Sequence, residues 1–552
     1  MPEASSTVSR PRWRRLGLLG AAALCIALLI ALPVLYVAGS VFSGGSDTWS
    51  HVVATGLPRY VWNTAVLLLG VAYGVISIGV LCAWLVTMYR FPGRDVLEWA
   101  LVLPLAMPAY VMAYAYTDWL QFTGAVQSAL RALTGWQARE YWFPEIRSMW
   151  GAVAILSFAL YPYVYIIART AFVELSRSAI EASRLAGYGP SGAFLRVALP
   201  LARPAIVAGT SLALMETLAD FGTVSYFALE VFTTGIFKAW LSLGDRVAAA
   251  QLSGCLLVFV ALVIVLERVS RGRAAYHEMA PRKSVPSQRL RGGAGALALL
   301  ACAAPVVFGF LLPGILLGYL AWDSAAYWSA RLPGLIVNSF GIAGLTAVAA
   351  VALATVMAYA SRLTRSRLVA AANRVAMLGY AVPGAVIAIG VLVPLGRLDN
   401  SLAGWLERAF GMHTGLLLTG TVAALVYAYL VRLLAVALQT VDAGLVKITP
   451  SMEDAARSLG ASPVRTLLRV HAPLLRPSLA TAALLVFVDV LKELPATFAL
   501  RPFNFDTLAI EAYNLAKDER LAEAAAPSLV IVAVGLLPVL FVAKRYFKGA
   551  PG

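Results

Sequence analysis

The chain has 552 residues, of which 60% are hydrophobic and only 13% are charged, and its mean hydropathy is +0.79. A water-soluble domain cannot bury so much apolar surface, so the composition excludes a soluble enzyme and indicates a chain that lies mostly in lipid. The formal net charge is +16, but the basic residues fall in short loops between apolar runs. This distribution is a signal of membrane topology and does not indicate a nucleic-acid surface.

The apolar runs predict an all-α polytopic membrane protein with about twelve transmembrane helices. A basic cytoplasmic linker, residues 268–292, separates a first repeat (residues 1–267) from a second repeat (residues 293–552). Because each repeat is predicted to cross the membrane six times, both termini and the linker should share one side, and the positive-inside rule predicts that it is the cytoplasm. The spans are predicted near residues 16–42, 61–88, 98–119, 149–173, 204–229, 248–267, 293–321, 334–361, 369–396, 415–440, 477–500 and 524–543.

Two polar segments, residues 178–204 and 451–477, repeat each other at an offset of 273 positions. We call them the first and second elbow. Each opens with a serine followed three residues later by an acid, which is the spacing of a capping box and predicts a short helix beginning at each serine. These serine–acid pairs are Ser178 with Glu181 and Ser451 with Asp454.

The remaining helix-end and helix-start residues are also the same in both elbows. Gly187 and Gly460 are predicted to end the first short helix in a left-handed conformation, which glycine adopts at little cost. A second short helix is predicted to begin at Pro190 and Pro463, since proline suits the first helical position. Each elbow is therefore predicted to be a helix–turn–helix that forms a docking surface.

Both elbows share one pattern: an acid, an alanine, four residues and a glycine, then nine residues and Val-x-(Leu/Ala)-Pro. This pattern resembles the EAA loop of ABC importer permeases. In that family the loop holds the helix that contacts the ATPase subunit. The pattern departs from the usual one at Ser183, Asp454 and Ala472. The resemblance implies a coupling role for Glu181, Ala182, Gly187, Asp454, Ala455 and Gly460.

The repeat continues outside the elbows, because Asn63-Thr64 matches Asn338-Ser339 at an offset of 275. Six spans in each half give the two repeats the same orientation, so they form a parallel repeat with a pseudo-twofold axis along the membrane normal. Together with the EAA resemblance, this predicts the type I ABC importer permease fold.

The chain contains no Gly-Lys dipeptide and so no phosphate-binding loop of the kind that an ATPase needs. It is therefore predicted to be a transport subunit without enzymatic activity or a bound cofactor. Two elbows on one chain fit two copies of a separate ATPase subunit.

Acidic residues follow both elbows at matched positions. Glu216 and Asp220 are four residues apart, as are Asp489 and Glu493, so each pair is predicted to share one helix face near mid-bilayer. We interpret them as a carboxylate-lined path for a hard cation, with no stable metal site and with Glu216 and Asp489 as transient ligands. The alternative is that the acids pair internally, for example with Lys492. The membrane helices that carry these acids are predicted to be interrupted just after them, at Gly222-Thr223 and at Pro495-Ala496-Thr497.

The stretches METLADFGTVSYF and FVDVLKELPATFALRPFNFDTLA resemble the fused permeases of ferric-iron ABC importers. The resemblance implies a multi-pass protein of the bacterial inner membrane, served by a periplasmic substrate-binding protein, with ferric iron as the substrate. Fused thiamine and phosphonate permeases share the architecture and remain alternatives. A proton-coupled secondary transporter would also explain the acids, but it gives the elbows no role.

Overall fold

The computed structural model describes residues 17–44, 46–137, 140–174, 183, 185, 187–271, 288–324, 328–364, 366–461 and 463–547. The helices of the first half are α1 (Leu18–Ser40), α2 (Asp47–Thr55), α3 (Leu57–Met88), α4 (Arg94–Ala100), α5 (Ala109–Leu120), α6 (Ala125–Thr134), α7 (Met149–Glu174), α9 (Pro190–Ala193), α10 (Leu199–Ala219), α11 (Gly222–Tyr226), α12 (Phe232–Phe237) and α13 (Arg246–Arg271).

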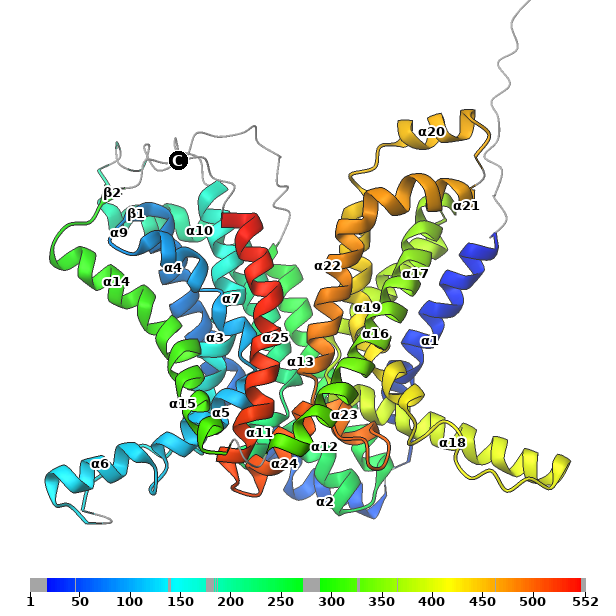
Figure 1. Ribbon diagram of the computed structural model, residues 1–552, viewed down its shortest axis with the longest axis horizontal. Coiled ribbons are helices and arrows are strands. Elements are labelled where there is room, and N and C mark those ends of the chain that lie inside the picture. The colour runs from blue at the N-terminus through cyan, green and yellow to red at the C-terminus, as the bar shows by residue number, and fades with distance from the viewer. Residues whose placement is uncertain are drawn as a thin grey trace, which may run out of the picture. The chain divides into compact units, whose positions relative to one another are not determined.

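The second half has a similar series of helices (Figure 1). They are α14 (Gly293–Val306), α15 (Leu312–Asp323), α16 (Trp328–Thr364), α17 (Arg367–Met377), α18 (Gly384–Phe410), α19 (Val422–Leu445), α20 (Pro450–Ser458), α21 (Pro463–Thr466), α22 (Ala472–Leu491), α23 (Pro495–Leu500), α24 (Leu508–Lys517) and α25 (Leu521–Phe547). Short 3₁₀ or π segments are η1 (Leu103–Ala106), η2 (Phe194–Ala198), η3 (Lys238–Ser242), η4 (Val307–Leu311), η6 (Leu378–Ala381) and η7 (Leu467–His471).

Eleven helical stretches of the described chain are long and apolar enough to cross a membrane. A twelfth span is formed if the pair 94–106 and 109–134, bent by 93°, is counted as one crossing. This confirms the all-α fold with about twelve membrane helices. Helices are required here because a backbone in hydrocarbon must satisfy its own hydrogen bonds.

The chain divides into two compact units that do not coincide with the two sequence repeats. Unit 1 comprises residues 1–32, 346–380 and 430–486, and it contains the second elbow. Unit 2 comprises residues 33–345, 381–429 and 487–552, and it contains the first elbow and both helix breaks.

In unit 2, helices α3, α7 and α10 pack closely because glycines face the neighbouring helix. A Cβ on Gly74 would lie 2.1 Å from Oγ of Ser157, and one on Gly209 would lie 2.8 Å from Cα of Val164. Helices in lipid gain little from hydrophobic burial, so such close approach is a main source of their association.

In unit 1, the end of α19 is fastened to α16 just before the second elbow. Arg362 of α16 donates to the carbonyl oxygens of Leu445 and Ile448, each at 2.6 Å. A cation at the last carbonyls of a helix is favourable because those groups have no partner within the helix.

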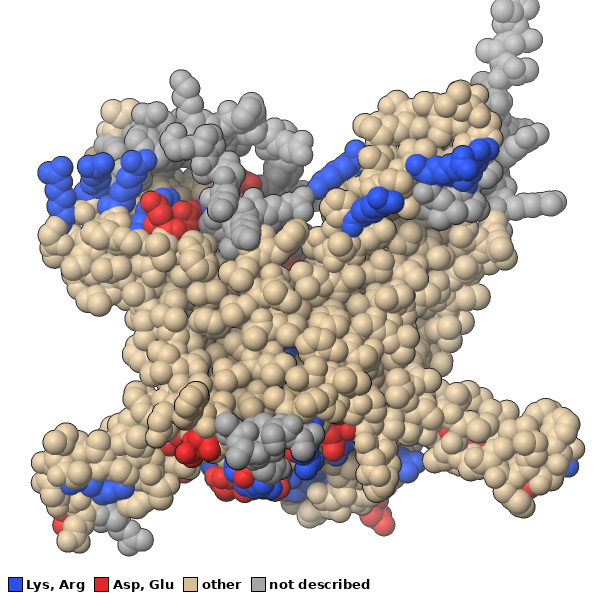
Figure 2. All heavy atoms as spheres, viewed as in Figure 1, with Lys and Arg blue, Asp and Glu red and all other residues tan. Residues whose placement is uncertain are grey.

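Strands β1 (Tyr89–Arg90) and β2 (Gln288–Arg289) pair in parallel and join the end of the linker to the loop between α3 and α4. At the start of the linker, α13 continues to Arg271, so it includes the first four residues of the predicted linker. In unit 2, Figure 2 shows charged side chains gathered at the end that carries α4 and at the opposite end around α24, with almost none between.

Candidate coupling and translocation sites

Both elbows turn at a left-handed glycine, as predicted. Gly187 has φ +80° and Gly460 has φ +76°. The N–H of Tyr188 donates to the carbonyl of Ser183, and the N–H of Ala461 donates to the carbonyl of Ala456, each at 3.0 Å. This bond is the 6→1 bond of a Schellman motif, so the two elbows end their first helix in the same way.

A Cβ built on Gly187 or Gly460 would meet no atom within 4 Å. The glycines are therefore required by their backbone conformation and not by packing. On α20, Asp454 and Ala455 are exposed at the surface of unit 1. Glu181 and Ala182, as well as Ser178, lie outside the described residues.

The predicted start of the helix in the second elbow is wrong by one residue. Helix α20 begins at Pro450, so Thr449 and not Ser451 occupies the N-cap position. The hydroxyls of Thr449 and Ser451 lie 2.8 Å apart. Proline at the first helical position sets this start, because its fixed φ suits a helix and its missing N–H would have no partner there.

The second helix of each elbow begins at Pro190 and Pro463, as predicted, but it is not a separate short helix. A π-helical segment carries α9 into α10 over Phe194–Ala198, and another carries α21 into α22 over Leu467–His471. These segments match at the 273-residue offset. A π-bulge bends a helix without ending it, so each elbow is continuous with the membrane helix that follows it.

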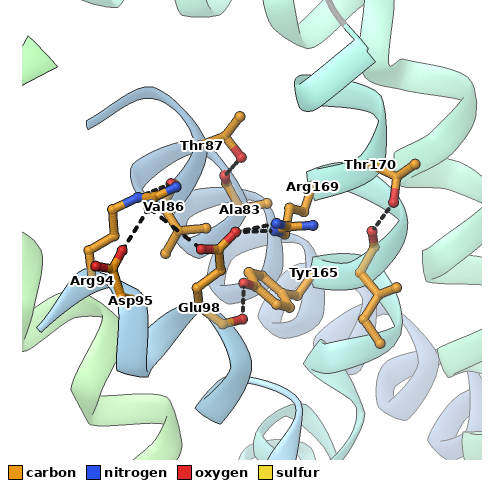
Figure 3. A network of polar contacts seen from close by, with 10 residues as sticks. Ala83, Val86, Thr87, Arg94, Asp95, Glu98, Tyr165, Arg169 and Thr170 are labelled. Atoms are coloured by element: carbon orange, nitrogen blue, oxygen red, sulfur yellow. Dashed lines mark hydrogen bonds and ion pairs between the residues drawn. The ribbon is translucent and has the colours of Figure 1, made fainter. Parts of the chain in front are cut away.

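A polar network fixes the helix that enters the first elbow (Figure 3). Nε of Arg169 in α7 donates to Oε1 of Glu98 in α4 at 3.0 Å, and the hydroxyl of Tyr165 donates to the backbone carbonyl of Glu98 at 2.6 Å. Arg94 lies 3.5 Å from the same carboxylate and donates to the carbonyl of Val86 at 2.7 Å. In unit 1 the comparable fastening is made by Arg362.

After each elbow the membrane helix breaks next to an acid. Asp220 follows α10 and has ψ 131°, so it has left the helical conformation. Its carboxylate accepts the Thr223 hydroxyl at 3.0 Å and the N–H of Val224 at 3.1 Å. The acid therefore caps α11, which begins at Gly222.

Glu493 makes the same cap in the second repeat. Its two oxygens accept the N–H groups of Ala496 and Thr497, each at 3.0 Å, and Oε2 accepts the Thr497 hydroxyl at 2.9 Å. The Thr497 hydroxyl is also 2.7 Å from that of Tyr429. The prediction that Asp220 and Glu493 share a helix face with the preceding acids is wrong, because both lie beyond the helix end.

The other two acids, Glu216 and Asp489, lie within α10 and α22 and are partly exposed. Asp489 pairs with Lys492 at 2.8 Å. Glu216 and Tyr163 are near enough to Lys492 to interact with it electrostatically. One lysine thus stands beside one acid from each repeat, and the internal pairing considered as an alternative does occur at Asp489.

The two breaks pack against residues that sequence reasoning missed. A Cβ on Gly222 would lie 2.6 Å from Cβ of Tyr110, and one on Gly384 would lie 2.6 Å from Oε1 of Glu493. Beyond the breaks, aromatic rings from both repeats form one cluster, with ring centroids between 4.3 and 5.7 Å apart. Its members are Phe221, Phe237, Phe498 and Tyr513.

The matched Asn63 and Asn338 hold the segment beyond each break. Asn63 donates to the carbonyl of Glu230 at 2.8 Å, and Asn338 donates to that of Asp506 at 3.1 Å. Thr64 and Ser339, the next residues, accept the N–H of Phe232 and of Leu508. The sequence revealed these dipeptides as a repeat, but it did not reveal their role.

An ion pair joins the repeats at the same end of unit 2. The guanidinium of Arg147 binds both carboxylate oxygens of Glu519, at 2.6 and 2.8 Å, and the hydroxyl of Tyr226 at 3.1 Å. The hydrogen bond from Arg147 lowers the pKa of Glu519 below its usual value. The sequence did not indicate this pair, because Arg147 and Glu519 are two of many charged residues in the loops.

Within the described ranges, no three His, Cys, Asp or Glu side chains lie together in a way that could hold a metal ion.

The chain matches the family model "Binding-protein-dependent transport system inner membrane component" twice, over residues 75–272 and 350–547. Among curated relatives, it is 28% identical to the Fe(3+)-transport system permease protein FbpB 2 of Haemophilus influenzae over 95% of this chain and 97% of that one. It is 31% identical to a probable molybdenum ABC transporter permease of Haloferax volcanii over 46% of this chain and 88% of that one. It is 29% identical to the sulfate transport system permease CysT of Escherichia coli over 38% and 73%.

These matches support the ABC importer permease and not the alternative of a proton-coupled secondary transporter. The repeated domain is an inner-membrane, multi-pass subunit that works with a binding protein and an ATPase. The chain belongs to the binding-protein-dependent transport system inner membrane component family, and it is an ABC importer permease that carries two copies of this domain.

Proposed function

We propose that this permease carries ferric iron across the inner membrane, and that Glu216 and Asp489 supply its transient oxygen ligands. The observation that carries the proposal is the division of labour among the four acids. Asp220 and Glu493 are engaged in capping α11 and α23, whereas Glu216 and Asp489 lie inside the preceding helices. Carboxylate oxygen suits a hard, highly charged cation.

The charge around Lys492 supports a cation. Glu216 and Asp489 carry two negative charges and Lys492 one positive charge, so the group is net negative when all three are ionised. Buried charges are tolerated in a membrane when they are paired, and they mark substrate routes. A weak site also suits transport, because an ion that binds too tightly cannot leave.

An oxyanion is the second candidate substrate. Relatives named for sulfate and molybdenum transport match less than half of the chain, and Lys492 is the charge that an oxyanion would need. The ferric permease relative matches nearly the full length, which favours iron.

We further propose that each elbow docks one ATPase subunit, and that the elbows, termini and linker face the cytoplasm. The matched Schellman turns and π-bulges support equivalent docking at two places. The segment with the aromatic cluster and the Arg147–Glu519 pair would then lie on the periplasmic side, where it would close the path between substrate deliveries.

The test is uptake by vesicles that contain the full-length permease, its ATPase and its binding protein. Ferric iron, sulfate and molybdate are each supplied as a radiolabelled ion with ATP inside the vesicles. We expect ATP-dependent accumulation of iron alone. Accumulation of sulfate or molybdate without iron would overturn the iron assignment and leave the permease assignment intact.

A further inference from the structure

Two arms extend from unit 2 at the end opposite α9 (Figure 1). The first arm comprises α6 and the described residues up to Trp142, and the second comprises the C-terminal part of α18 and the returning segment, residues 395–421. Figure 1 shows α6 and α18 reaching outward on opposite sides. The helices of the arms are the C-terminal parts of two candidate membrane stretches, 109–134 and 384–410, and the proposed transport function does not use them.

The two arms are built alike. Each helix ends at a left-handed glycine, Gly135 or Gly411, whose N–H donates to the carbonyl of Arg131 or Glu407, each at 2.9 Å. Both bonds match at an offset of 276 positions. The two arm helices thus end in the same way, in a form of C-terminus that is common among helices.

In the first arm, polar groups turn inward. The side chain of Gln127 is buried, and its amide donates to the carbonyl of Leu120 at 2.9 Å and accepts the hydroxyl of Tyr141 at 2.8 Å. Arg131 donates to the same hydroxyl at 3.0 Å and lies over the ring of Phe122. The polar face of α6 is thereby satisfied by the arm and by the residues that connect it to α5.

The second arm uses a buried carboxylate for the same purpose. Asp399 is fully buried, and it accepts the backbone N–H groups of Leu417, Leu418 and Thr419 at distances between 2.6 and 3.0 Å. The returning segment is thus pinned to α18 by an acid that the sequence pattern did not single out.

The outer faces of both arms are apolar. Leu133 is 86% exposed and Trp142 is 85% exposed in the first arm, and Leu398 and Trp405 are 53% and 52% exposed in the second. Leu398 and Trp405 are seven residues apart and share a face of α18, whereas the exposed Asn400 lies on the opposite, polar face. Exposed leucine and tryptophan side chains beside the buried polar groups of Gln127 and Asp399 are the reverse of what water favours.

We propose that both arms lie flat in the headgroup region of the bilayer leaflet at this end of unit 2, with their apolar faces turned toward the acyl chains. An amphipathic helix rich in leucine and tryptophan binds this region, and tryptophan is enriched there because its ring is apolar while its N–H can meet water. Lipid is favoured over a soluble partner because the arm helices are parts of stretches that are apolar enough to enter a membrane and expose few charges on this face. The arms would resist tilting of the permease during transport.

The test uses the full-length permease in vesicles of phosphatidylethanolamine and phosphatidylglycerol. The native cysteines are replaced by alanine, and a nitroxide is attached at Leu133→Cys or Leu398→Cys. Matched controls carry it on the polar face of the same helix, at Thr134→Cys or Asn400→Cys. Collision rates are measured with oxygen, which concentrates in lipid, and with a nickel chelate, which stays in water.

We expect the ratio of oxygen to nickel collisions to be severalfold higher at residues 133 and 398 than at their controls. Equal ratios at all four positions would overturn the proposal, because the arms would then stand in water. The proposal would also be overturned if the ratios at 133 and 398 rose above their controls only after excess binding protein was added, since the faces would then be protein-binding surfaces. Labelled variants are compared after ATPase stimulation shows that each is folded.

Discussion

At the first helix break Asp220 caps α11, and at the second Glu493 caps α23, through bonds at matched positions. The charges beside the two caps differ. Lys492 precedes Glu493 and pairs with Asp489, whereas the matched residue before Asp220 is Ala219. Both repeats need an acid that accepts the N–H groups at the start of the helix after the break. This need does not explain why the charges beside the two caps differ. We infer that the caps hold the fold and that the remaining charges serve the substrate.

The largest effects are expected when each capping acid, Glu493 or Asp220, is replaced. Glu493→Ala should destabilise the permease by about 3 kcal/mol, because the two buried N–H groups of Ala496 and Thr497 lose their charged acceptor. Asp220→Ala should cost less, about 2 kcal/mol, since it removes one N–H bond and one hydroxyl bond. Thermal unfolding of the purified permease measures both, and equal losses of under about 0.5 kcal/mol would mean that neither acid acts as a cap.

The packing at the second break gives a smaller effect. Gly384→Ala places a methyl group against the Glu493 carboxylate and should cost about 2 kcal/mol, because overpacking forces neighbouring atoms to move. Gly396→Ala in the same helix is the matched control, since a Cβ there meets no atom within 4 Å. If both variants melt at the same temperature, the second break is looser than the structure shows.

The elbows extend the comparison to the coupling sites. Gly187→Ala and Gly460→Ala should each cost about 1 kcal/mol, because a side chain disfavours a positive φ. Asparagine tolerates this conformation better and is the control at each position. We expect ATP hydrolysis to be uncoupled from uptake in the alanine variants, with the membrane region folded. Full coupling in both would exclude the glycine turns from ATPase docking.

The smallest expected effect concerns the Arg147–Glu519 pair between the repeats. Since the pKa of Glu519 is lowered in the folded protein, the pair stabilises the fold above the unfolded pKa of about 4.3. This contribution is lost as the pH falls through the lowered folded pKa. Glu519→Gln should remove this pH dependence between pH 7 and pH 3, as measured by thermal unfolding. An unchanged pH profile would contradict the assignment.

The repeat, the spans and the glycine turns could be predicted from the sequence because each leaves a local signal. Apolar length sets a span, and the left-handed turn at Gly460 needs glycine whatever surrounds it. The start of α20 was misplaced by one residue because Pro450 and Ser451 both give a valid N-terminal signal and only the fold chooses between them.

The roles of Asp220 and Glu493 could not be predicted. A spacing of four residues places two acids on one face only while the helix continues, and the helix ends before the second acid. The contacts of Gly384 and Arg147 join positions more than 75 residues apart along the chain, so no local pattern marks them.

The most direct test of the division between capping and substrate acids is the double variant Glu216→Gln with Asp489→Asn, assayed for ferric iron uptake in vesicles with the ATPase and binding protein. Asp518→Asn, which changes an exposed acid, is the control. We predict that the double variant loses iron uptake while its thermal stability and its stimulation of the ATPase stay at the parent level. Iron uptake at the parent rate would contradict the account, because Glu216 and Asp489 would then have no part in the path.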